Sequence, residues 1–359
     1  MNVICAGSVS LGREAFRDLG SLQLLPETDI TRASLAAADA VITRSKTRLN
    51  AELLQGTPVR FAGTCTAGID HADPSALAQL GIHFASAPGC NANAVSEYVV
   101  AALLEAHLKT GFTFAGATLG IVGCGEVGSR VAAKGQALGM TVLRNDPPKE
   151  AAGHPGPWTP LPELLRRADV LTLHVPLVED GPWPTRSLIG PAEIAQLKRG
   201  SLLLNACRGE VTASPALLAA RRAGHLSWLT LDVWDPEPNL PEDLLAVADL
   251  ATPHIAGHSV EGKVNGTRQI REQLCEVFGI QSPWDPAPLM PPPEHPVLAF
   301  ADLGSLEASL RSLVRRAYEI RVDDDALRAG GPAAFNALRR QYRDRREFAA
   351  HRITGAPTQ

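Results

Sequence analysis

The sequence predicts an α/β fold with two doubly wound parallel-sheet domains and a smaller C-terminal domain. Short runs of continuously apolar or β-branched residues alternate with helical stretches along most of the 359 residues. Strands of this kind are typical of parallel sheets that helices cover on both faces. Hydrophobic residues make up 45% of the chain and aromatic residues only 5%, a composition that favours helices packed on such sheets.

Residues 1–92 are expected to form a βα repeat in the first domain. Its strands are expected at 2–6, 40–44, 59–63 and 82–86. A long helix at 91–109, with apolar residues at helical spacing, then leads into the second domain. A further helix at 261–279 would pair with it and return the chain to the first domain. The first domain therefore comprises residues 1–92 and 259–280.

Residues 93–258 are expected to form the second parallel-sheet domain. Its strands are expected at 118–122, 140–146, 168–176, 200–208, 228–234 and 248–254. Prolines concentrated in residues 281–296 predict a stiff linker. The basic segment 297–359, with helices expected at 303–320 and 335–352, forms the C-terminal domain. Its arginines could bind nucleic acid, but a solvated helix face or a subunit contact is the more common use of such a segment.

The charge and cysteine patterns argue against several classes of protein. A formal net charge of −4 offers no overall attraction to nucleic acid or to an anionic membrane surface. Residues 1–10 lack a basic leader and a long apolar stretch, so no export signal is expected. The six cysteines form no CxxC pair, which favours a reduced, cytoplasmic protein over a disulfide framework.

A glycine-rich motif at the start of the second domain indicates a dinucleotide site. It matches G-x-G-x-x-G between an expected strand and an expected helix. Backbone N–H groups at that helix N-terminus would face a pyrophosphate. The glycines alone could also form a tight turn without a ligand. The expected cofactor contacts in the motif are Gly123, Gly125, Glu126, Val127 and Gly128.

Asp146 lies at the end of the next expected strand, about 20 residues beyond the motif. A carboxylate there can accept hydrogen bonds from the ribose hydroxyls and would repel a 2′-phosphate. Arg144 could instead accommodate a 2′-phosphate, but alternation along the strand should point it to the other side. NAD is therefore expected rather than NADP.

Arg208, Glu237 and His254 follow three separate expected strands. Ligands of open parallel sheets bind at the carboxyl ends of the strands. An arginine can hold a carboxylate, a histidine can carry a hydroxyl proton, and a carboxylate can keep that histidine charged. Taken singly, Arg208 could be structural and Glu237 a solvated acid. Together, downstream of the dinucleotide motif, they indicate hydride transfer on a hydroxy acid.

His258 follows His254 by the spacing of a zinc-binding pair on a helix. Pro253 and Gly257 favour a loop instead, and no third ligand follows. No metal site is therefore expected.

The whole chain resembles the D-isomer-specific 2-hydroxyacid dehydrogenases. The segments that carry the resemblance are "PGCNANAVSEYV", "NACRGEV", "LDVWDPEP", "PHIAGHSVEGK" and the terminal "LRRQYRDRREF". The resemblance implies a flavodoxin-like substrate domain, a Rossmann NAD domain and an α+β C-terminal domain that forms a homodimer. It also implies that Arg208 binds the substrate carboxylate, that His254 accepts the C2 hydroxyl proton, and that Glu237 supports His254.

The resemblance assigns further contacts around the cofactor and the substrate. Near the nicotinamide it implies Val175, Ala206, Cys207, Asp232 and Gly257. Substrate contacts are implied for Ser45, Thr66 and His258, with Arg44 or Lys46 supplying charge for a terminal phosphate. Val175 stands where this family often has threonine, and His258 where the most similar members have tyrosine.

The implied reaction is the NAD-dependent oxidation of 4-phospho-D-erythronate at C2 to 3-hydroxy-2-oxo-4-phosphooxybutanoate, in the biosynthesis of pyridoxal 5′-phosphate (vitamin B6). The first alternative is a broader D-2-hydroxyacid dehydrogenase or 2-oxoacid reductase, which would not depend on the phosphate. The second is a non-catalytic, NADH-sensing binding protein on the same fold, which would turn over no hydroxy acid.

Overall fold

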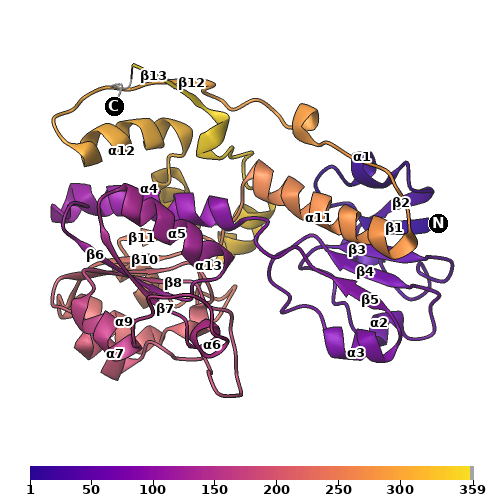
Figure 1. The fold of residues 1–359 in the computed structure, drawn as a ribbon, viewed down its shortest axis with the longest axis horizontal. Coiled ribbons are helices and arrows are strands. Elements are labelled where there is room, and N and C mark those ends of the chain that lie inside the picture. Colours follow the sequence, from indigo (N-terminus) through magenta and orange to yellow (C-terminus); the bar gives the residue numbers. More distant parts are fainter. Residues whose placement is uncertain (356–359) are drawn as a thin grey trace. The chain divides into compact units, whose positions relative to one another are not determined.

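The computed structural model describes residues 1–355 and divides the chain into two compact units (Figure 1). Unit 1 consists of residues 1–91 and 259–292, and unit 2 contains residues 92–258 together with the chain from residue 293 onward. Each unit is built on its own parallel sheet. These sheets confirm the predicted α/β class with two parallel-sheet domains.

The sheet of unit 1 has five parallel strands in the order β2-β1-β3-β4-β5. Its strands are β1 (Asn2–Ala6), β2 (Ser21–Leu25), β3 (Ala40–Thr43), β4 (Phe61–Thr64) and β5 (His83–Ala85). Its helices are α1 (Gly12–Phe16), α2 (Ala51–Leu54), α3 (Pro74–Gln79) and α11 (Val260–Phe278), with short 3₁₀ turns at η1 (Glu27–Asp29) and η3 (Ala287–Leu289). This is the strand order of flavodoxin-like folds.

The longest helix of unit 1, α11, is capped at both ends. The Ser259 side chain accepts a hydrogen bond from the N–H of Gly262 at 2.8 Å and so caps the first turn. Gly279 ends the helix in the left-handed conformation. Between them, Ile270 and Leu274 are fully buried and join the core formed by the strands. The helix thereby completes unit 1 after the chain has passed through unit 2.

The sheet of unit 2 has six parallel strands in the order β11-β10-β9-β8-β6-β7. They are β6 (Thr118–Val122), β7 (Thr141–Asn145), β8 (Val170–Leu173), β9 (Ser201–Asn205), β10 (Leu226–Leu231) and β11 (Leu250–Ala251). Strand order reverses between β6 and β8. In open α/β sheets, ligands bind beyond the carboxyl ends of the strands at this kind of switch point.

Helices cover both faces of this sheet, with α4 and α5 on one face and α7 and α9 on the other (Figure 1). They are α4 (Ala92–Thr110), α5 (Glu126–Ala137), α6 (Pro147–Ala151), α7 (Leu161–Arg167), α8 (Pro191–Gln196), α9 (Ser214–Arg222) and α10 (Glu242–Val247), with a 3₁₀ turn at η2 (Gly209–Val211). Strands β8 and β9 are buried along their whole length. Their continuous apolar runs reflect this covering on both sides.

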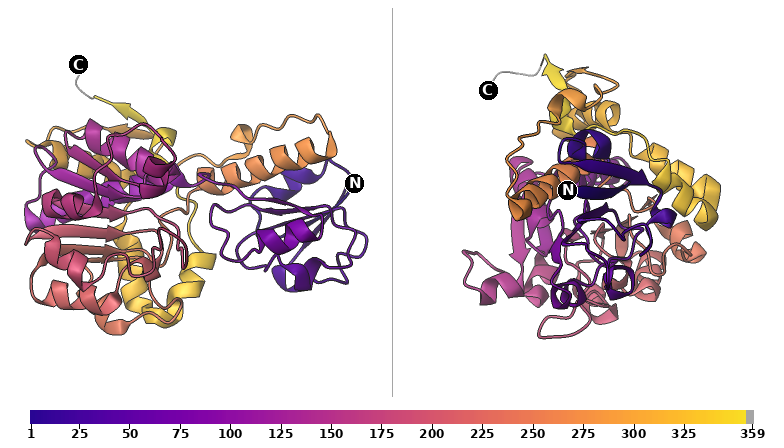
Figure 2. Two further views of the ribbon diagram at one scale, coloured as in Figure 1. Left: turned by 60° about the horizontal axis from the view of Figure 1, so that its bottom comes forward. Right: turned by 90° about the vertical axis from the view of Figure 1, so that its right-hand side faces the viewer.

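Residues 293–355 pack on the rest of unit 2 (Figure 2). It contains β12 (Val297–Ala299), α12 (Leu306–Ala317), α13 (Arg321–Arg340), η4 (Phe348–Ala350) and β13 (Arg352–Thr354). The buried carboxylate of Glu105 in α4 pairs with Arg311 at 2.7 Å and with Arg321 at 3.0 Å. Asp324 accepts a hydrogen bond from the N–H of Ala251 at 2.8 Å. These contacts make the segment part of unit 2, and its role as a dimerisation domain stays a prediction.

Two details of this C-terminal segment were not predicted from the sequence. The helix expected at 335–352 belongs to α13, which starts at Arg321, is interrupted at Gly331 and ends at Arg340. Strands β12 and β13 pair in parallel, at positions that the expected α+β character of this segment did not specify. Residues 356–359 of the predicted C-terminal domain lie outside the described residues. Across residues 1–355, none of the helices has the length and apolar character needed to cross a bilayer.

Candidate active site

The glycine motif forms the turn between β6 and α5 at the switch point. Gly123 has φ 86°, and a Cβ at this position would lie 2.5 Å from the carbonyl oxygen of His174 beyond β8. Only glycine fits both this backbone conformation and this approach. Gly125 caps α5, with Glu126 and Val127 in the first turn of the helix. Because no neighbouring atom fills the space beside Gly125, the helix N-terminus has room for a pyrophosphate.

Asp146 is tied directly to this glycine turn. Its carboxylate accepts hydrogen bonds from the N–H of Cys124 at 2.8 Å and from the N–H of Lys149 at 3.1 Å. Arg144, the residue that could have accommodated a 2′-phosphate, places its guanidinium 5.8 Å from the ring centre of Trp158. An acid beside the glycine turn, with the neighbouring arginine stacked on a tryptophan, fits the ribose end of NAD.

His254 and Glu237 form a hydrogen-bonded pair at the carboxyl ends of β11 and β10. The Nδ1 atom of His254 lies 2.9 Å from Oε2 of Glu237, and Oε1 of Glu237 accepts a hydrogen bond from the N–H of Trp234 at 3.0 Å. Burial by itself would raise the pKa of Glu237, but hydrogen bonding and the charge of His254 bring it below the ordinary value. A carboxylate held ionised at Nδ1 orients the ring and leaves Nε2 to exchange a proton.

The backbone around His254 is held by Asp232, which is only 1% exposed. The Asp232 carboxylate accepts hydrogen bonds from the N–H groups of Ile255 and Ala256 at 2.8 and 2.9 Å, and from Oγ1 of Thr252 at 2.6 Å. Its carbonyl oxygen accepts from the N–H of His254 at 2.7 Å. Asp232 therefore fixes the loop that presents His254. Its predicted contact with the nicotinamide stays a prediction.

Arg208 leaves β9 beside the segment that carries Glu237. A Cβ on Gly209 would collide with the backbone of Trp234, so the two strand exits pack directly against each other. The amide of Asn205 donates to the carbonyl of Arg208 at 2.9 Å. Arg208 itself donates from Nη1 to the carbonyl of Cys207 at 2.7 Å. These contacts set the backbone that carries the predicted carboxylate-binding arginine.

The remaining predicted cofactor positions lie at the same edge of the sheet. Cys207 is buried, which raises the pKa of its thiol to about 11, and its Sγ lies 3.1 Å from Oδ1 of Asn205. The side chain of Val175 packs beside Gly123. Ala206 follows β9 and Gly257 follows β11, each partly exposed. Because Val175 has no hydroxyl, a cofactor contact at this position would come from apolar and backbone atoms.

Two side chains of unit 2 that were not predicted from the sequence lie behind this loop. The ring of Tyr342 packs edge-on against His258, with 5.7 Å between ring centres and an interplanar angle of 70°. Arg345 donates from Nη2 to the carbonyl of Ala256 at 3.0 Å. Both come from the C-terminal segment, and no local pattern in the sequence relates that segment to the loop.

The predicted substrate residues of unit 1 follow neighbouring strands of its sheet. Ser45 and Lys46 are exposed in the turn after β3. Thr66, after β4, shares a hydrogen bond with Oγ1 of Thr64 at 2.9 Å and donates to the carbonyl of Gly68 at 2.8 Å. Arg44 donates to the carbonyl of Ser8 at 3.4 Å. Within unit 1, hydroxyls and cations thus meet at the carboxyl edge of the sheet.

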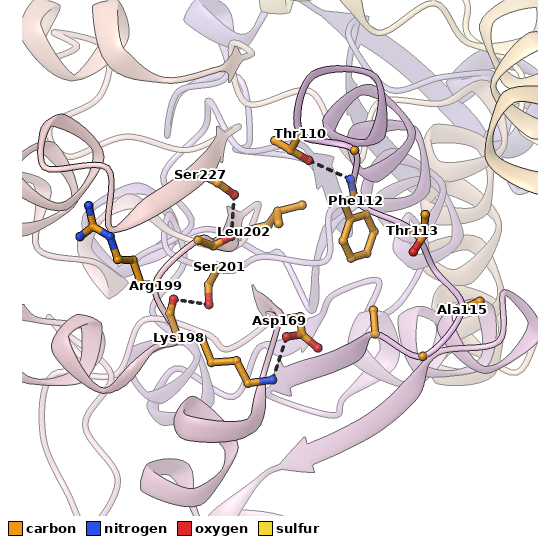
Figure 3. A pocket seen from close by; sticks show the side chains of 14 residues that line it. Thr110, Phe112, Thr113, Ala115, Asp169, Lys198, Arg199, Ser201, Leu202 and Ser227 are labelled. Atoms are coloured by element: carbon orange, nitrogen blue, oxygen red, sulfur yellow. Dashed lines mark hydrogen bonds and ion pairs between the residues drawn. The ribbon is translucent and has the colours of Figure 1, made fainter.

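The opposite, amino edge of the unit 2 sheet has a pocket of about 530 Å³ (Figure 3). Its polar side chains bond mainly to neighbouring protein atoms: Lys198 pairs with Asp169 at 2.7 Å, and Ser227 donates to the carbonyl of Gly200 at 2.6 Å. The candidate acid–base groups all lie at the other edge. Within residues 1–355, no cluster of three or more His, Cys, Asp or Glu side chains could hold a metal ion.

Comparison with known proteins places this geometry in a family. Residues 93–256 match the family described as "D-isomer specific 2-hydroxyacid dehydrogenase, NAD binding domain", and residues 289–359 match a domain of unknown function. The chain is 44% identical to erythronate-4-phosphate dehydrogenase of Cronobacter sakazakii over 353 residues, which is 98% of this chain and 93% of that protein.

Two solved structures give the same result for the fold. D-lactate dehydrogenase of Aquifex aeolicus, in complex with NAD and lactic acid, matches with a TM-score of 0.64 at 26% identity, covering 77% of this chain and 96% of that one. The NAD⁺-bound 3-phosphoglycerate dehydrogenase of Entamoeba histolytica matches with a TM-score of 0.65 at 25% identity, covering 78% and 95%.

Proposed function

The chain belongs to the D-isomer-specific 2-hydroxyacid dehydrogenase family and is an NAD-dependent dehydrogenase, and we propose that its substrate is 4-phospho-D-erythronate. Oxidation at C2 gives 3-hydroxy-2-oxo-4-phosphooxybutanoate, with NADH and a proton as the other products. Similarity to an erythronate-4-phosphate dehydrogenase over nearly the whole chain supports this substrate. The reaction would serve the biosynthesis of pyridoxal 5′-phosphate.

The hydrogen-bonded pair of His254 and Glu237 is the observation that carries the proposed chemistry. Nε2 of His254 accepts the proton of the C2 hydroxyl as the C2–H bond breaks. Glu237 stabilises the imidazolium that forms, because its carboxylate is held ionised at Nδ1. Arg208 binds the substrate carboxylate and so orients C2 toward the cofactor.

The carboxyl edge of the unit 2 sheet fits NAD. The N–H groups at the start of α5, with the open space beside Gly125, would hold the pyrophosphate, and Asp146 would hold the ribose hydroxyls. When bound there, NAD⁺ would supply the acceptor for the hydride that leaves C2. Val175, Ala206, Cys207 and Gly257 would line the nicotinamide end through backbone and apolar contacts.

The 4-phosphate is proposed to bind at the carboxyl edge of unit 1. Ser45 and Thr66 would donate hydroxyl hydrogen bonds, and Arg44 and Lys46 would supply positive charge. His258 would take a substrate contact from unit 2. We also propose that the protein works as a homodimer in the cytoplasm. The six free, buried cysteines support a reducing compartment.

Phosphate recognition is tested by comparing kcat/KM for D-erythronate with and without its 4-phosphate. The phosphorylated acid should be preferred by at least ~100-fold, because several charge-assisted hydrogen bonds depend on it. Equal values would reject the proposed substrate and leave a broader D-2-hydroxyacid dehydrogenase. The absence of turnover with any hydroxy acid would instead support a cofactor-sensing protein.

A further inference from the structure

The loop from His254 to His258 has a conformation that must be held from outside. His254 has φ 56°, in the left-handed region that residues other than glycine rarely adopt. Such a conformation is unfavourable for a residue with a side chain and persists only where surrounding contacts enforce it. Asp232 holds the N–H groups of this loop. The carbonyl group of Ala256 points to a different partner, Arg345.

Arg345 reaches the loop from the C-terminal segment and is almost entirely buried, at 4% exposure. Its Nη2 atom donates to the carbonyl oxygens of Ala256 at 3.0 Å and of Ala94, at the start of α4, at 3.2 Å. Its guanidinium lies 4.2 Å from the ring centre of Tyr318. The guanidinium of Arg345 therefore links the His254–His258 loop to helix α4 while it packs on the ring of Tyr318.

The cost of burying this cation argues that its position matters. Within the described residues Arg345 has no carboxylate at ion-pair distance, and its Nε and Nη1 atoms have no hydrogen-bond partner. Although burial disfavours the charge, nearby groups that include the carboxylates of Glu97 and Asp323 raise the pKa of this guanidinium. Removing a cation from water is costly when no carboxylate bonds to it directly. A methionine of similar length would fill the same space without that cost, but it could not hold the carbonyl of Ala256.

The surroundings of Arg345 form a rigid support. The hydroxyl groups of Tyr318 and Tyr342 both donate to the buried carboxylate of Asp323, at 3.1 and 2.9 Å. The ring of Tyr318 packs against the guanidinium of Arg345, and the ring of Tyr342 packs against His258. Asp323 thereby fixes both rings that lie against the His254–His258 loop and its arginine.

We propose that Arg345 is a positioning residue for His254. By holding the carbonyl of Ala256, it keeps the loop in the conformation in which His254 meets both Glu237 and the substrate hydroxyl. The C-terminal segment thus contributes to the active site of its own chain, whatever it contributes to assembly. This inference rests on the proposed role of His254 as the proton acceptor.

The test compares the full-length wild-type chain with Arg345→Met and Arg345→Lys. Arg345→Met should lower kcat by ~10- to 100-fold, since a misplacement of about 1 Å at a reacting group can cost that much. The KM for NAD⁺ should change by less than about threefold, because the glycine turn and Asp146 are untouched. The pH dependence of kcat should shift, and Arg345→Lys, which keeps the charge and one donor, should be intermediate.

Arg328→Met is the matched control. Arg328 also comes from the C-terminal segment and donates to two carbonyls of unit 2, those of Leu245 and Ala248 at 2.9 and 2.7 Å, but these lie at α10. This variant should lose stability without a change in kcat or in its pH profile. If Arg345→Met also lost stability but kept the kcat and pH profile of Arg328→Met, the proposal would be overturned.

Amide hydrogen exchange of the peptide spanning residues 252–258 provides a readout that needs no substrate. Exchange should be about tenfold faster or more in Arg345→Met than in Arg328→Met, because the loop opens more often. If wild type fails to oxidise 4-phospho-D-erythronate, this comparison still decides whether Arg345 holds the loop. If Arg345→Met does not fold, Arg345→Lys with wild-type kcat and wild-type exchange would overturn the proposal.

Discussion

The His254–His258 loop of unit 2 and the 44–48 turn of unit 1 would serve the same reaction, but they are held very differently. The first has buried residues at Ile255 and Ala256 and is bonded to Asp232 and Arg345. The second exposes Ser45, Lys46 and Arg48 to solvent. Proton transfer needs a preset geometry, whereas a phosphate can recruit exposed cations when it binds. Changes in the first region should therefore affect kcat and stability, and changes in the second should affect substrate affinity.

The largest effect is expected for His254→Asn. Asparagine tolerates the left-handed backbone of this position, but its amide cannot accept a proton near neutral pH. Loss of the general base should lower kcat by about 10²–10⁴, while the melting temperature and NAD⁺ affinity stay close to wild type. Steady-state kinetics and calorimetry provide the check, and near-normal kcat in a folded protein would refute the assigned role.

Asp232→Asn should show that the loop is held by buried hydrogen bonds. An amide cannot accept from two N–H groups and a hydroxyl as the carboxylate does, so we expect unfolding free energy to fall by about 2–4 kcal/mol. Urea unfolding at pH 7 measures this change. The exposed Lys46→Ala is the control, with an expected change within about 0.5 kcal/mol. Similar losses in both variants would contradict the contrast between the two regions.

Lys46→Ala tests the unit 1 turn by its effect on substrate rather than on stability. Loss of one charge-assisted contact should lower kcat/KM for 4-phospho-D-erythronate by ~10-fold or more. The kcat/KM for D-erythronate, which has no phosphate, should not change. The kcat for 4-phospho-D-erythronate should also stay the same. A loss that is equal for both substrates would place Lys46 outside the phosphate site.

The smallest effect concerns Glu97, which lies in α4 next to the C-terminal segment. Its side chain accepts hydrogen bonds from Asn93 and from the N–H of Phe348 at 3.0 and 2.9 Å. Burial, with the nearby charge of Glu347, raises its pKa from 4.5 to about 7. Because the folded state favours the protonated form, this group stabilises the fold fully below pH 4.5 and loses that contribution as the pH rises through 7.

Glu97→Gln should therefore match wild type near pH 4 and exceed it in unfolding free energy by about 1–2 kcal/mol at pH 8. Glutamine keeps an oxygen that can accept both hydrogen bonds. Chemical denaturation at the two pH values measures the difference. A gain that appears at pH 4 and disappears at pH 8 would show that the sign is wrong.

Local patterns predicted the parts of the fold that are locally encoded. Continuous apolar runs predicted the central strands, and the glycine motif predicted the turn at which β6 meets α5. Strand β2 was missed because Ser21–Leu25 lies at the edge of its sheet and is only partly buried, so it lacks a continuous apolar run of buried residues. The helix expected at 335–352 was misplaced because a charged, arginine-rich run has no apolar face to mark its end.

The sequence by itself determined the family and the cofactor and predicted the residues proposed for hydride transfer, because these depend on short motifs at strand ends. Only the tertiary structure decided how His254 is held. Asp232 and Glu237 come from a neighbouring strand exit, and Arg345 and Tyr342 come from a segment far along the chain. Contacts of this kind depend on which strands and helices pack together, and such packing leaves no periodic signal in the local sequence.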